Sequence, residues 1–585
     1  MKPRIFGIET EYGLTGNAGS GWGLTAETAA SVIRHLLETP DLRNTNNFLE
    51  NGARLYLDGG THPEYATPEC DDILELIAHD KAGERILGAR LRRAEQRLGE
   101  EGTPIAIRLF KNNTDSTGNS YGCHENYLVK RDVEFARLSR TLAPFLVTRQ
   151  VFAGAGKAYQ SRDGIRYCLS QLGQRPPFSA GATPYPVVDT RDEPHADEMR
   201  YRRLHITIGD ANMSEVATYL KVGTTALLLD MLEDGVCGPD LTLQSVSSAL
   251  HDISGDPTLR KTVNLQDGRK LTALELQMEY LEQATRYAGA CGTSAETNEL
   301  LRRWADVLSK LAADPMQLER QVDWVTKWAL MERFIGRHRL SWEDPKVGLL
   351  DLQYHDIRRE EGIYARLVER EAVDRMVDEH AVVHAQRNPP QTTRARLRGD
   401  FIRSANLSRT TCLVDWTYIR LAEDPEEQAV ACLDPFRAFD ERVESLVRLM
   451  HLKAGLGEVE GRPSARCGAV SLDDGQLPVG IGVPVMSPRQ TVCRAIEPDL
   501  MNVAAGEAGS AAAGRVEAHV GSCRPCRDEF ACYRTLEGMI DSLRRAPLAD
   551  DDATLAHARL AARLSDLRSR IPRRRKPRTS GPPAA

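Results

Sequence analysis

Apolar and polar residues alternate with a period of two in several short stretches of the first 210 residues, and such alternation predicts β-strands. Apolar positions recur with the period of an α-helix in five longer segments. The strands and helices do not alternate regularly, so they favour an α+β fold with a mostly antiparallel sheet. The predicted strands are 4–14, 53–58, 105–112, 125–131 and 203–210, and the predicted helices are 24–38, 72–98, 214–234, 272–312 and 315–336.

Proline and glycine divide the chain into one large unit and several shorter segments. A proline-marked turn near residue 400 ends the dense alternation, so we expect a catalytic-sized domain over 1–400 and a small lobe over 401–455. A stretch rich in Gly, Pro and Ser predicts a linker over 456–490. Two helical patterns around a Cys/His cluster predict a module over 491–545, and 546–585 predicts a helix followed by a basic disordered tail.

Composition narrows the class of protein. Hydrophobic residues make up 41% of the chain and charged residues 27%, as in soluble globular proteins. No apolar run is long enough to cross a bilayer, and the start, MKPRIFGIETEYG, lacks the apolar core of a signal peptide, so we expect a cytoplasmic protein without a membrane partner. The net charge of −7 argues against nucleic-acid binding. The basic run 573–578 is interpreted as a solubilising tail, with a nucleic-acid arm as the alternative.

Two carboxylates lie on one face of the first predicted strand. Glu9 and Glu11 share that face, while Ile8, Thr10 and Tyr12 point to the other. Two acids at this spacing are costly to bury unless a cation offsets their charge. Mg²⁺ is such a cation, because it takes oxygen ligands from a few carboxylates and from phosphate. A solvated strand face is the alternative explanation.

A second strand adds polar side chains of a different kind. Arg54, Tyr56 and Asp58 alternate with leucines, so they share one face and offer a planar cation, a phenolic oxygen and a carboxylate. Glu64 and Thr67 follow a Gly-Gly turn that lets the chain double back towards this row. A surface strand more usually presents Lys, Thr or Ser to solvent. The two strands together therefore favour a reaction site over a merely solvated strand face.

Two further stretches carry candidate polar residues. A polar segment around two glycines could satisfy its own backbone or could line a nucleotide or substrate cleft. A cluster of arginines near the last predicted strand suits an anionic ligand, although salt bridges with neighbouring acids explain it equally well. The first group is Asn112, Asn113, Asp115, Asn119, His124 and Glu125; the second is Arg191, Arg202, Arg203 and His205.

Long motifs in the chain resemble the family of Pup ligases and depupylases, which is related in fold to glutamine synthetase and the carboxylate-amine ligases. The resemblance runs from residue 1 to about 450, and motifs of this length are highly specific. The motifs are GIETEYG, NGARLYLDGGTHPEYATPEC, FKNNTDSTGNSYGCHENYLV, LVTRQVFAGAGK, DTRDEPHAD, YRRLHITIGDANMSE and NPPQTTRARLRGDF.

The resemblance implies a curved antiparallel sheet, backed by helices, that holds ATP and Mg²⁺ beside a small C-terminal lobe. It implies ligation of the C-terminal glutamate of Pup to lysine side chains of target proteins through a γ-glutamyl phosphate, in the proteasomal degradation pathway. Each family residue is present at its matching position. The resemblance places Glu9, Tyr56 and Glu64 at the metal, Arg54, Thr67 and Trp416 at ATP, and Asp58 as the catalytic base.

The two branches of this family differ in ways that the sequence partly resolves. Depupylases carry a long extra loop before NGARLY, whereas only residues 14–50 intervene here. The motifs NNTDSTGNSYGCHENY and LVDWTYIRL are similar to the ligase form, while IGDANMSEVATYLKVG and RLSWEDPKVGLLDLQYHDIR are nearer to the depupylase branch. The site and the loop favour a ligase, with depupylation or Pup deamidation as the alternative.

The C-terminal segment has the spacing of a zinc site. His519, Cys523 and Cys526 form an H-x3-C-x2-C arrangement, and Cys493 could complete a tetrahedral set. The segment resembles the zinc-binding helical module of anti-sigma factors. Unmetallated thiols are the alternative, and a regulatory protein that acts through this module is a third possibility for the whole chain.

Overall fold

The computed structural model describes most of the chain up to residue 454. The segment predicted to hold a linker, a zinc module and a basic tail, with Cys493, His519, Cys523 and Cys526, lies outside the described residues. None of the described helices is long and apolar enough to cross a membrane. The described residues are 2–17, 23–38, 47–58, 62–114, 120–161, 164–174, 188–191, 195–236, 240–292, 294–422 and 429–454.

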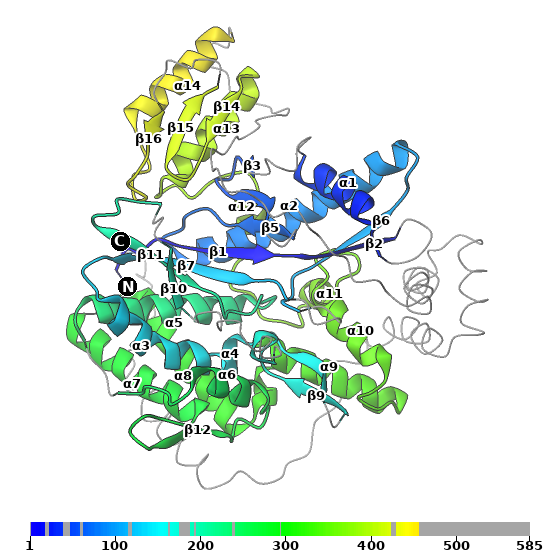
Figure 1. Cartoon of the computed structure of the whole chain (residues 1–585), viewed down its shortest axis with the longest axis vertical. Coiled ribbons are helices and arrows are strands. Elements are labelled where there is room, and N and C mark those ends of the chain that lie inside the picture. Colours follow the sequence, from blue (N-terminus) through cyan, green and yellow to red (C-terminus); the bar gives the residue numbers. More distant parts are fainter. Residues whose placement is uncertain are drawn as a thin grey trace, which may run out of the picture.

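A seven-stranded antiparallel sheet forms the centre of the molecule (Figure 1). Its strands come from the N-terminal half of the chain, and helices flank it, so the predicted α+β fold is confirmed. The strand order is β10 (Val188–Arg191), β11 (Tyr201–Ile206), β7 (Cys123–Lys130), β1 (Phe6–Glu11), β5 (Pro63–Ala66), β4 (Arg54–Leu57) and β3 (Asn47–Phe48).

Smaller sheets extend this frame. One two-stranded sheet carries the chain beyond the end of β1, and the three-stranded sheet belongs to the small lobe. The pairs are β2 (Gly13–Asn17) with β6 (Ala106–Phe110), β8 (Lys157–Ser161) with β9 (Gly164–Cys168), and β12 (Thr262–Asn264) with β13 (Lys270–Thr272); the lobe has β14 (Cys412–Val414), β15 (Tyr418–Leu421) and β16 (Val430–Ala431).

Helices bury one face of the central sheet. Ile8 of β1 and Tyr127 of β7 belong to the main hydrophobic core together with residues of two long helices, which contact β1 and β7. These are α2 (Ile73–Glu100) and α5 (Glu215–Glu233); the others are α1 (Ala26–Leu37), α3 (Phe135–Thr148), α4 (Gln150–Ala153), α6 (Val246–Ser254), α7 (Ala273–Cys291), α8 (Ala295–Ala313), α9 (Asp323–His338), α10 (Pro345–Tyr354), α11 (Ile363–Glu369), α12 (Glu379–Ala385), α13 (Ala395–Ser408) and α14 (Glu441–Lys453), with short 3₁₀ turns η1 (Leu172–Gln174) and η2 (Pro315–Leu318).

Two predicted helices differ in extent from the observed ones. The single helix expected over 272–312 is divided into α7 and α8, because Gly292 adopts a positive φ of 76° and Ser294 caps the new helix by accepting from the backbone N–H of Thr297. The helix expected over 315–336 begins as the 3₁₀ turn η2, and α9 starts at Asp323.

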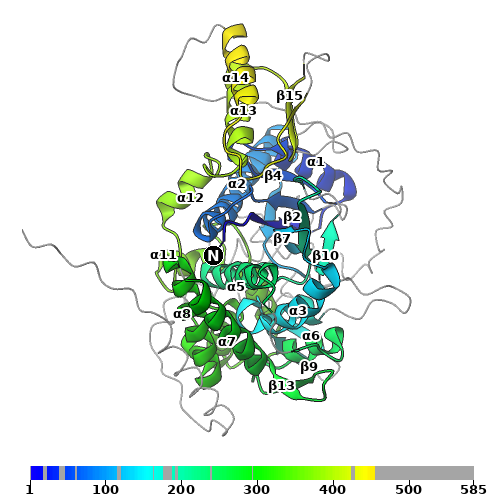
Figure 2. The ribbon, with the colours of Figure 1, turned by 90° about the vertical axis from the view of Figure 1, so that its left-hand side faces the viewer.

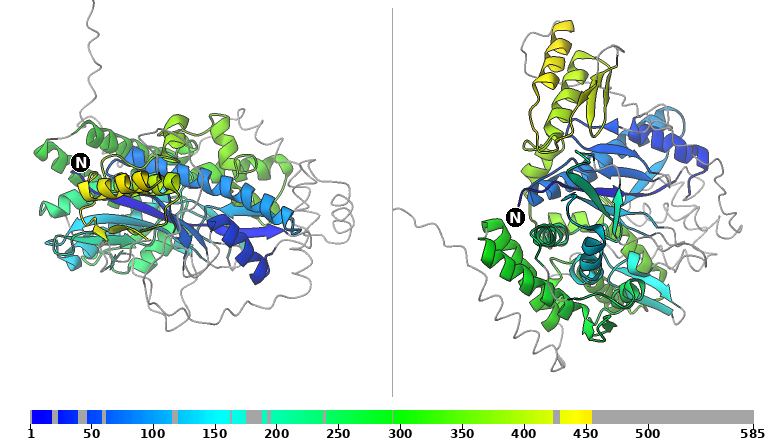
Figure 3. Two further views of the ribbon diagram at one scale, coloured as in Figure 1. Left: turned by 90° about the horizontal axis from the view of Figure 1, so that it is seen from above. Right: turned by 60° about the vertical axis from the view of Figure 1, so that its left-hand side comes forward.

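The small lobe stands at one end of the molecule (Figure 3), and Figure 1 shows it above β3, the strand at one edge of the central sheet. Its core includes Leu397 and Phe401 of α13 and also Phe48 of β3. Glu69 ties the lobe to the sheet, because its carboxylate accepts from Arg394 Nε at 2.8 Å and from Arg398. Burial raises the pKa of Glu69, but the charges and hydrogen bonds of these two arginines outweigh burial and lower it to about 2.

Candidate active site

The face of the sheet opposite the helices is lined with polar side chains. Strand register places Glu9 of β1 opposite His124 of β7, and Glu11 of β1 opposite Glu64 of β5. Strand β5 also pairs with β4, and there Glu64 lies opposite Tyr56. Because strand residues two apart share a face, these side chains gather on one surface. The acids and the tyrosine that the sequence analysis placed on separate strands are therefore neighbours.

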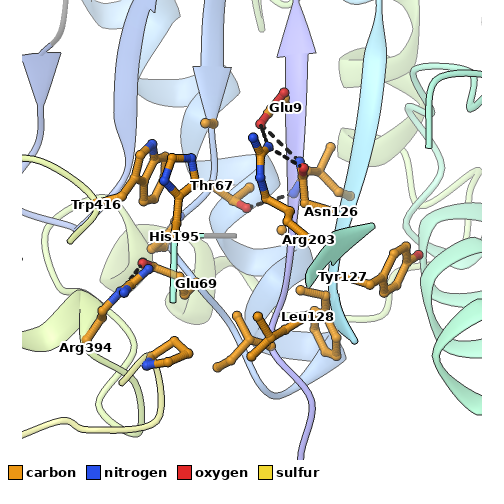
Figure 4. A pocket seen from close by; sticks show the side chains of 17 residues that line it. Glu9, Thr67, Glu69, Asn126, Tyr127, Leu128, His195, Arg203, Arg394 and Trp416 are labelled. Atoms are coloured by element: carbon orange, nitrogen blue, oxygen red, sulfur yellow. Dashed lines mark hydrogen bonds and ion pairs between the residues drawn. The ribbon is translucent and has the colours of Figure 1, made fainter. Parts of the chain in front are cut away.

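Glu9 lies among nitrogen donors on two adjacent strands. Its Oε1 accepts from Asn126 Nδ2 at 3.0 Å and lies 3.6 Å from Arg203 Nη1, and its Oε2 lies 3.6 Å from His124 Nδ1. Figure 4 shows Asn126 and Arg203 pointing at this carboxylate. Burial raises the pKa of Glu9, but the hydrogen bond from His124 and the charges of His205 and Arg203 lower it to about 2. Glu9 is thus held as a carboxylate.

Glu64 has the opposite electrostatic environment. Its side chain is buried, and burial together with the charge of Glu9 raises its pKa well above the usual value; a hydrogen bond with Tyr56 opposes this rise, while Glu11 and Asp58 add to it. Burial and the charge of Glu64 likewise raise the pKa of Tyr56. Several carboxylates close together need a counter-charge, and this set of oxygen donors fits a hard divalent cation.

Asp58 lies directly after β4 and forms a second acidic group with Glu11 and His62. His62 Nδ1 lies 3.4 Å from Asp58 Oδ2 and 3.9 Å from Glu11 Oε2, and the backbone N–H of His62 also donates to Asp58. Glu11 accepts from the backbone N–H of Gly122 at 2.7 Å, but burial, the largest influence, raises its pKa. His62 was not among the residues predicted for the site, although its place between the Gly-Gly turn and Glu64 was a signal.

A cavity with an empty volume of about 580 Å³ lies beside Glu9 and extends towards the small lobe. Thr67 and Trp416 both line it, together with His195. Thr67 Oγ1 accepts from the backbone N–H of Ile8 at 3.0 Å. Trp416 packs edge-on against Phe48, with ring centroids 5.0 Å apart, and lies 5.8 Å from His195. The cavity is therefore lined by Thr67, which directly follows β5 of the central sheet, and by the aromatic ring of Trp416 from the small lobe.

Arg54 lies next to this cavity and is not among its lining residues. Its guanidinium carbon is 4.0 Å from the centre of the Tyr56 ring, so both side chains lie on the same face as predicted. Its Nε is buried and has no hydrogen-bond partner among the described residues. An anionic group at this position would give that donor a partner.

Some candidate residues lie away from this face. Glu125 is buried on the helix side, where it forms an ion pair with Arg149, so it does not line the cleft that the sequence analysis considered. Asn112 and Asn113 donate to backbone carbonyls of the same segment, as the structural alternative supposed. Arg202 donates to the carbonyl of Arg131. Asp115, Asn119 and the side chain of Arg191 lie outside the described part of the chain.

His195, Arg394 and Asn126 were not identified as site residues from the sequence. His195 belongs to the motif DTRDEPHAD, which was the only sequence signal for it. Its pKa is lowered to about 3 by burial first and then by the charges of Arg203 and Arg394. Arg203 and His205, which the sequence analysis did propose, both contact Asn126 Oδ1, at 2.8 and 3.0 Å.

Comparison with known proteins gives a consistent result. The family model described as Pup-ligase protein matches residues 4–420. A Pup--protein ligase from Geodermatophilus obscurus is 48% identical over 455 residues, which are 77% of this chain and 100% of the relative. A Pup--protein ligase from a Nocardioides species is 49% identical over 453 residues, covering 76% of this chain and 99% of the relative.

Two solved structures share the fold. The crystal structure of the complex between the prokaryotic ubiquitin-like protein Pup and its ligase PafA has a TM-score of 0.73 and 39% identity, and covers 77% of this chain and 92% of that one. The structure of the Pup ligase PafA in complex with ADP has a TM-score of 0.67 and 37% identity, covering 74% and 96%. The chain belongs to the Pup-ligase protein family.

Proposed function

We propose that this chain is an ATP-dependent ligase that joins the C-terminal glutamate of Pup to lysine side chains of target proteins. The observation that carries the proposal is the meeting of Glu9, Glu64 and Asp58 on one face of the sheet, beside the cavity that Thr67 and Trp416 line. A carboxylate is a poor electrophile, so the γ-phosphoryl group of ATP would first pass to the glutamate side chain, giving a γ-glutamyl phosphate and ADP.

Glu9, Tyr56 and Glu64 would hold Mg²⁺. The bound cation would neutralise charge that develops on the transferring phosphoryl group. The raised pKa of Glu64 supports this assignment, because a divalent cation would favour its ionised form against the neighbouring carboxylates. Arg203 and His124 leave Glu9 ionised before any cation arrives.

Arg54, Thr67 and Trp416 would bind the nucleotide. Trp416 offers an aromatic surface in the cavity wall, and Thr67 is fixed by its hydrogen bond to β1. Arg54 is close to the proposed metal ligands, and its planar fork suits phosphate oxygens.

Asp58 would act as the base in the second half of the reaction. It would accept a proton from the lysine ammonium or amine as the nitrogen attacks the acyl phosphate, so that an isopeptide bond forms and phosphate leaves. The backbone N–H of His62 fixes one carboxylate oxygen, which leaves the carboxylate oriented for this role.

The test is incubation of the purified chain with ATP, Mg²⁺, a lysine-bearing protein and Pup that ends in glutamate. We expect covalent conjugates on a denaturing gel and one ADP released per conjugate. Loss of preformed conjugates without new ones would instead identify a depupylase, and Pup ending in glutamine separates deamidation from ligation. Absence of ATP turnover in every arm would leave only the regulatory alternative.

Two further assignments concern the rest of the chain. We propose that Cys493, His519, Cys523 and Cys526 bind structural zinc within 491–545, and that the enzyme works in the cytoplasm on proteasome substrates. Zinc measured in the purified chain should be about one equivalent and should fall in a Cys523→Ser, Cys526→Ser variant. Unchanged metal content in that variant would contradict the zinc assignment.

A further inference from the structure

A second pocket lies away from the candidate active site, among α2, the first turn of α5, α11 and the segment that precedes α12. Figure 2 shows α11 and α12 along one side of the molecule, next to α2 and α5. The pocket has an empty volume of about 500 Å³ and shares no lining residue with the cavity beside Glu9. Its walls include Arg85, Arg359, Arg375, Tyr364, Met213 and Val368.

Three guanidinium groups of this pocket converge on one carboxylate. Glu379 Oε2 lies 3.0 Å from Arg85 Nη2 and 4.0 Å from Arg375 Nη1, and its Oε1 lies 3.4 Å from Arg359 Nη1. The Glu379 side chain is 46% exposed, so it can swing into solvent. Burial lowers the pKa of Arg85, and the charges of Arg359 and Arg375 lower it further, while the charges of Glu379 and Glu84 raise it.

The other acids in the pocket wall are held by their own partners. Each of them forms short contacts with a cation or with backbone N–H groups, so none needs the guanidinium groups of Arg85 or Arg359. Glu84 is held by Lys81 and Lys111 at 2.8 and 2.9 Å, Asp356 by Arg108 at 2.6 Å, and Glu215 by Arg375 and the backbone N–H groups of Met376 and Val377.

A buried hydroxyl in the same wall lacks a partner. Tyr364 is 3% exposed, and its hydroxyl has no hydrogen bond among the described residues. Burying a hydroxyl without a partner costs free energy, so a ligand oxygen that reached this group would recover that cost.

We propose that this pocket binds the phosphate group of a small phosphate monoester, and that Glu379 holds the place of that phosphate until it binds. A phosphate has three terminal oxygens for three guanidinium groups and a hydroxyl, whereas a carboxylate has only two. Met213 and Val368 would contact the apolar body of the ester. The proposal is independent of the reaction at Glu9 and Asp58.

Phenyl phosphate is a suitable probe, titrated calorimetrically into the full chain with ADP and Mg²⁺ at saturating concentrations to fill the candidate active site. Hydrogen exchange would locate the site, and we expect protection within residues 355–379. Arg359→Gln should weaken binding about tenfold, because it removes one charge-assisted contact. Tyr364→Phe should weaken it about threefold through loss of one hydroxyl. Arg92→Gln on α2 is the matched control and should bind as the unaltered chain does.

The Glu379→Gln variant tests whether these arginines form a binding site or only a structural cluster of ion pairs. Removal of the competing carboxylate should strengthen phenyl phosphate binding several-fold, whereas a purely structural cluster would only lose stability. Binding that Arg359→Gln leaves unchanged would identify an adventitious ion only and would overturn the proposal. Equal affinity for inorganic phosphate would overturn the assignment to an ester.

Discussion

Glu64 is a buried carboxyl group with three other carboxylates around it. Its folded-state pKa is raised, so the folded protein holds the proton more tightly than the unfolded chain does. The contribution of Glu64 to stability is therefore greatest below its unfolded pKa and is lost as the pH rises through the raised value. A cation bound at this position would reverse the loss, which couples metal binding to proton release.

Glu64→Gln should raise the melting temperature of the metal-free chain at pH 8, by about 2 °C, because it removes a charge that folding disfavours. The same variant should lose the stabilisation that Mg²⁺ gives to the unaltered chain. Thermal unfolding with and without Mg²⁺ at pH 5 and pH 8 measures both effects. A variant that is less stable than the unaltered chain at pH 8 without metal would contradict this reading of the Glu64 environment.

Asp58→Asn separates activation of Pup from transfer to lysine. The variant should form conjugates about 10²–10⁴ times more slowly, since the amide cannot accept a proton. Hydroxylamine attacks an acyl phosphate without a general base, so the hydroxamate of Pup should still accumulate with ATP. Loss of hydroxamate to the same extent as loss of conjugates would show that Asp58 is needed before transfer.

The residues of the site differ in how far sequence could identify them. Alternation along single strands was enough to put Arg54 and Tyr56 on one face, because the period of a strand is a local property. His195 and Arg394 enter the cavity wall through contacts between distant segments, which no local pattern encodes. Glu125 was ambiguous because its ion pair with Arg149 depends on a residue between α3 and α4, which no pattern around Glu125 reveals.

At the scale of elements, the close contact between α2 and β5 helps to fix where Glu64 lies in the site. A Cβ added at Gly83 would lie 2.5 Å from a ring carbon of Tyr65, so the glycine allows the helix to approach the strand closely. Tyr65 is the neighbour of Glu64 and points to the opposite face. The position of Glu64 on the polar face therefore depends on this close approach.

Gly83→Ala should destabilise the chain by about 1–3 kcal/mol, because the added methyl group must push α2 away from the sheet. Gly88→Ala on the same helix is the matched control, since a Cβ there has no atom within 4 Å. It should stabilise the helix by about 1 kcal/mol through its better helix propensity. Urea unfolding of both variants gives the comparison, and equal effects would contradict the steric argument.

The sequence predicted which helices and strands exist more accurately than it predicted where each one begins and ends. All five predicted strands of the first 210 residues are present, although the one predicted over 4–14 is divided at Tyr12 into β1 and β2, and the predicted helix over 72–98 is α2. The division of 272–312 was missed because apolar positions continue with helical period on both sides of Gly292, and the break depends on a backbone angle that periodicity does not reveal.

At the scale of the whole molecule, the relatives match about three quarters of the chain, and the family model matches residues 4–420. The relative from Geodermatophilus obscurus is covered completely by 455 residues of alignment, and α14 ends at Lys453. The proposed catalytic residues all lie within that part.

A chain truncated after residue 454 should keep the conjugation rate of the full chain while losing its zinc. Steady-state conjugation and metal analysis on both proteins test this, with the Cys523→Ser, Cys526→Ser variant of the full chain as control. A large fall in rate on truncation, absent from the cysteine variant, would mean that the extension takes part in catalysis.

The ion pairs of Glu69 imply an order of events during synthesis on the ribosome. A nascent chain that has exposed only residues up to about 390 contains every strand of the central sheet, yet it has no Arg394 or Arg398 to meet Glu69 and no Trp416 to line the cavity. The nucleotide binding that we propose for this cavity would therefore be gained late in synthesis, after the ribosome has translated most of the small lobe.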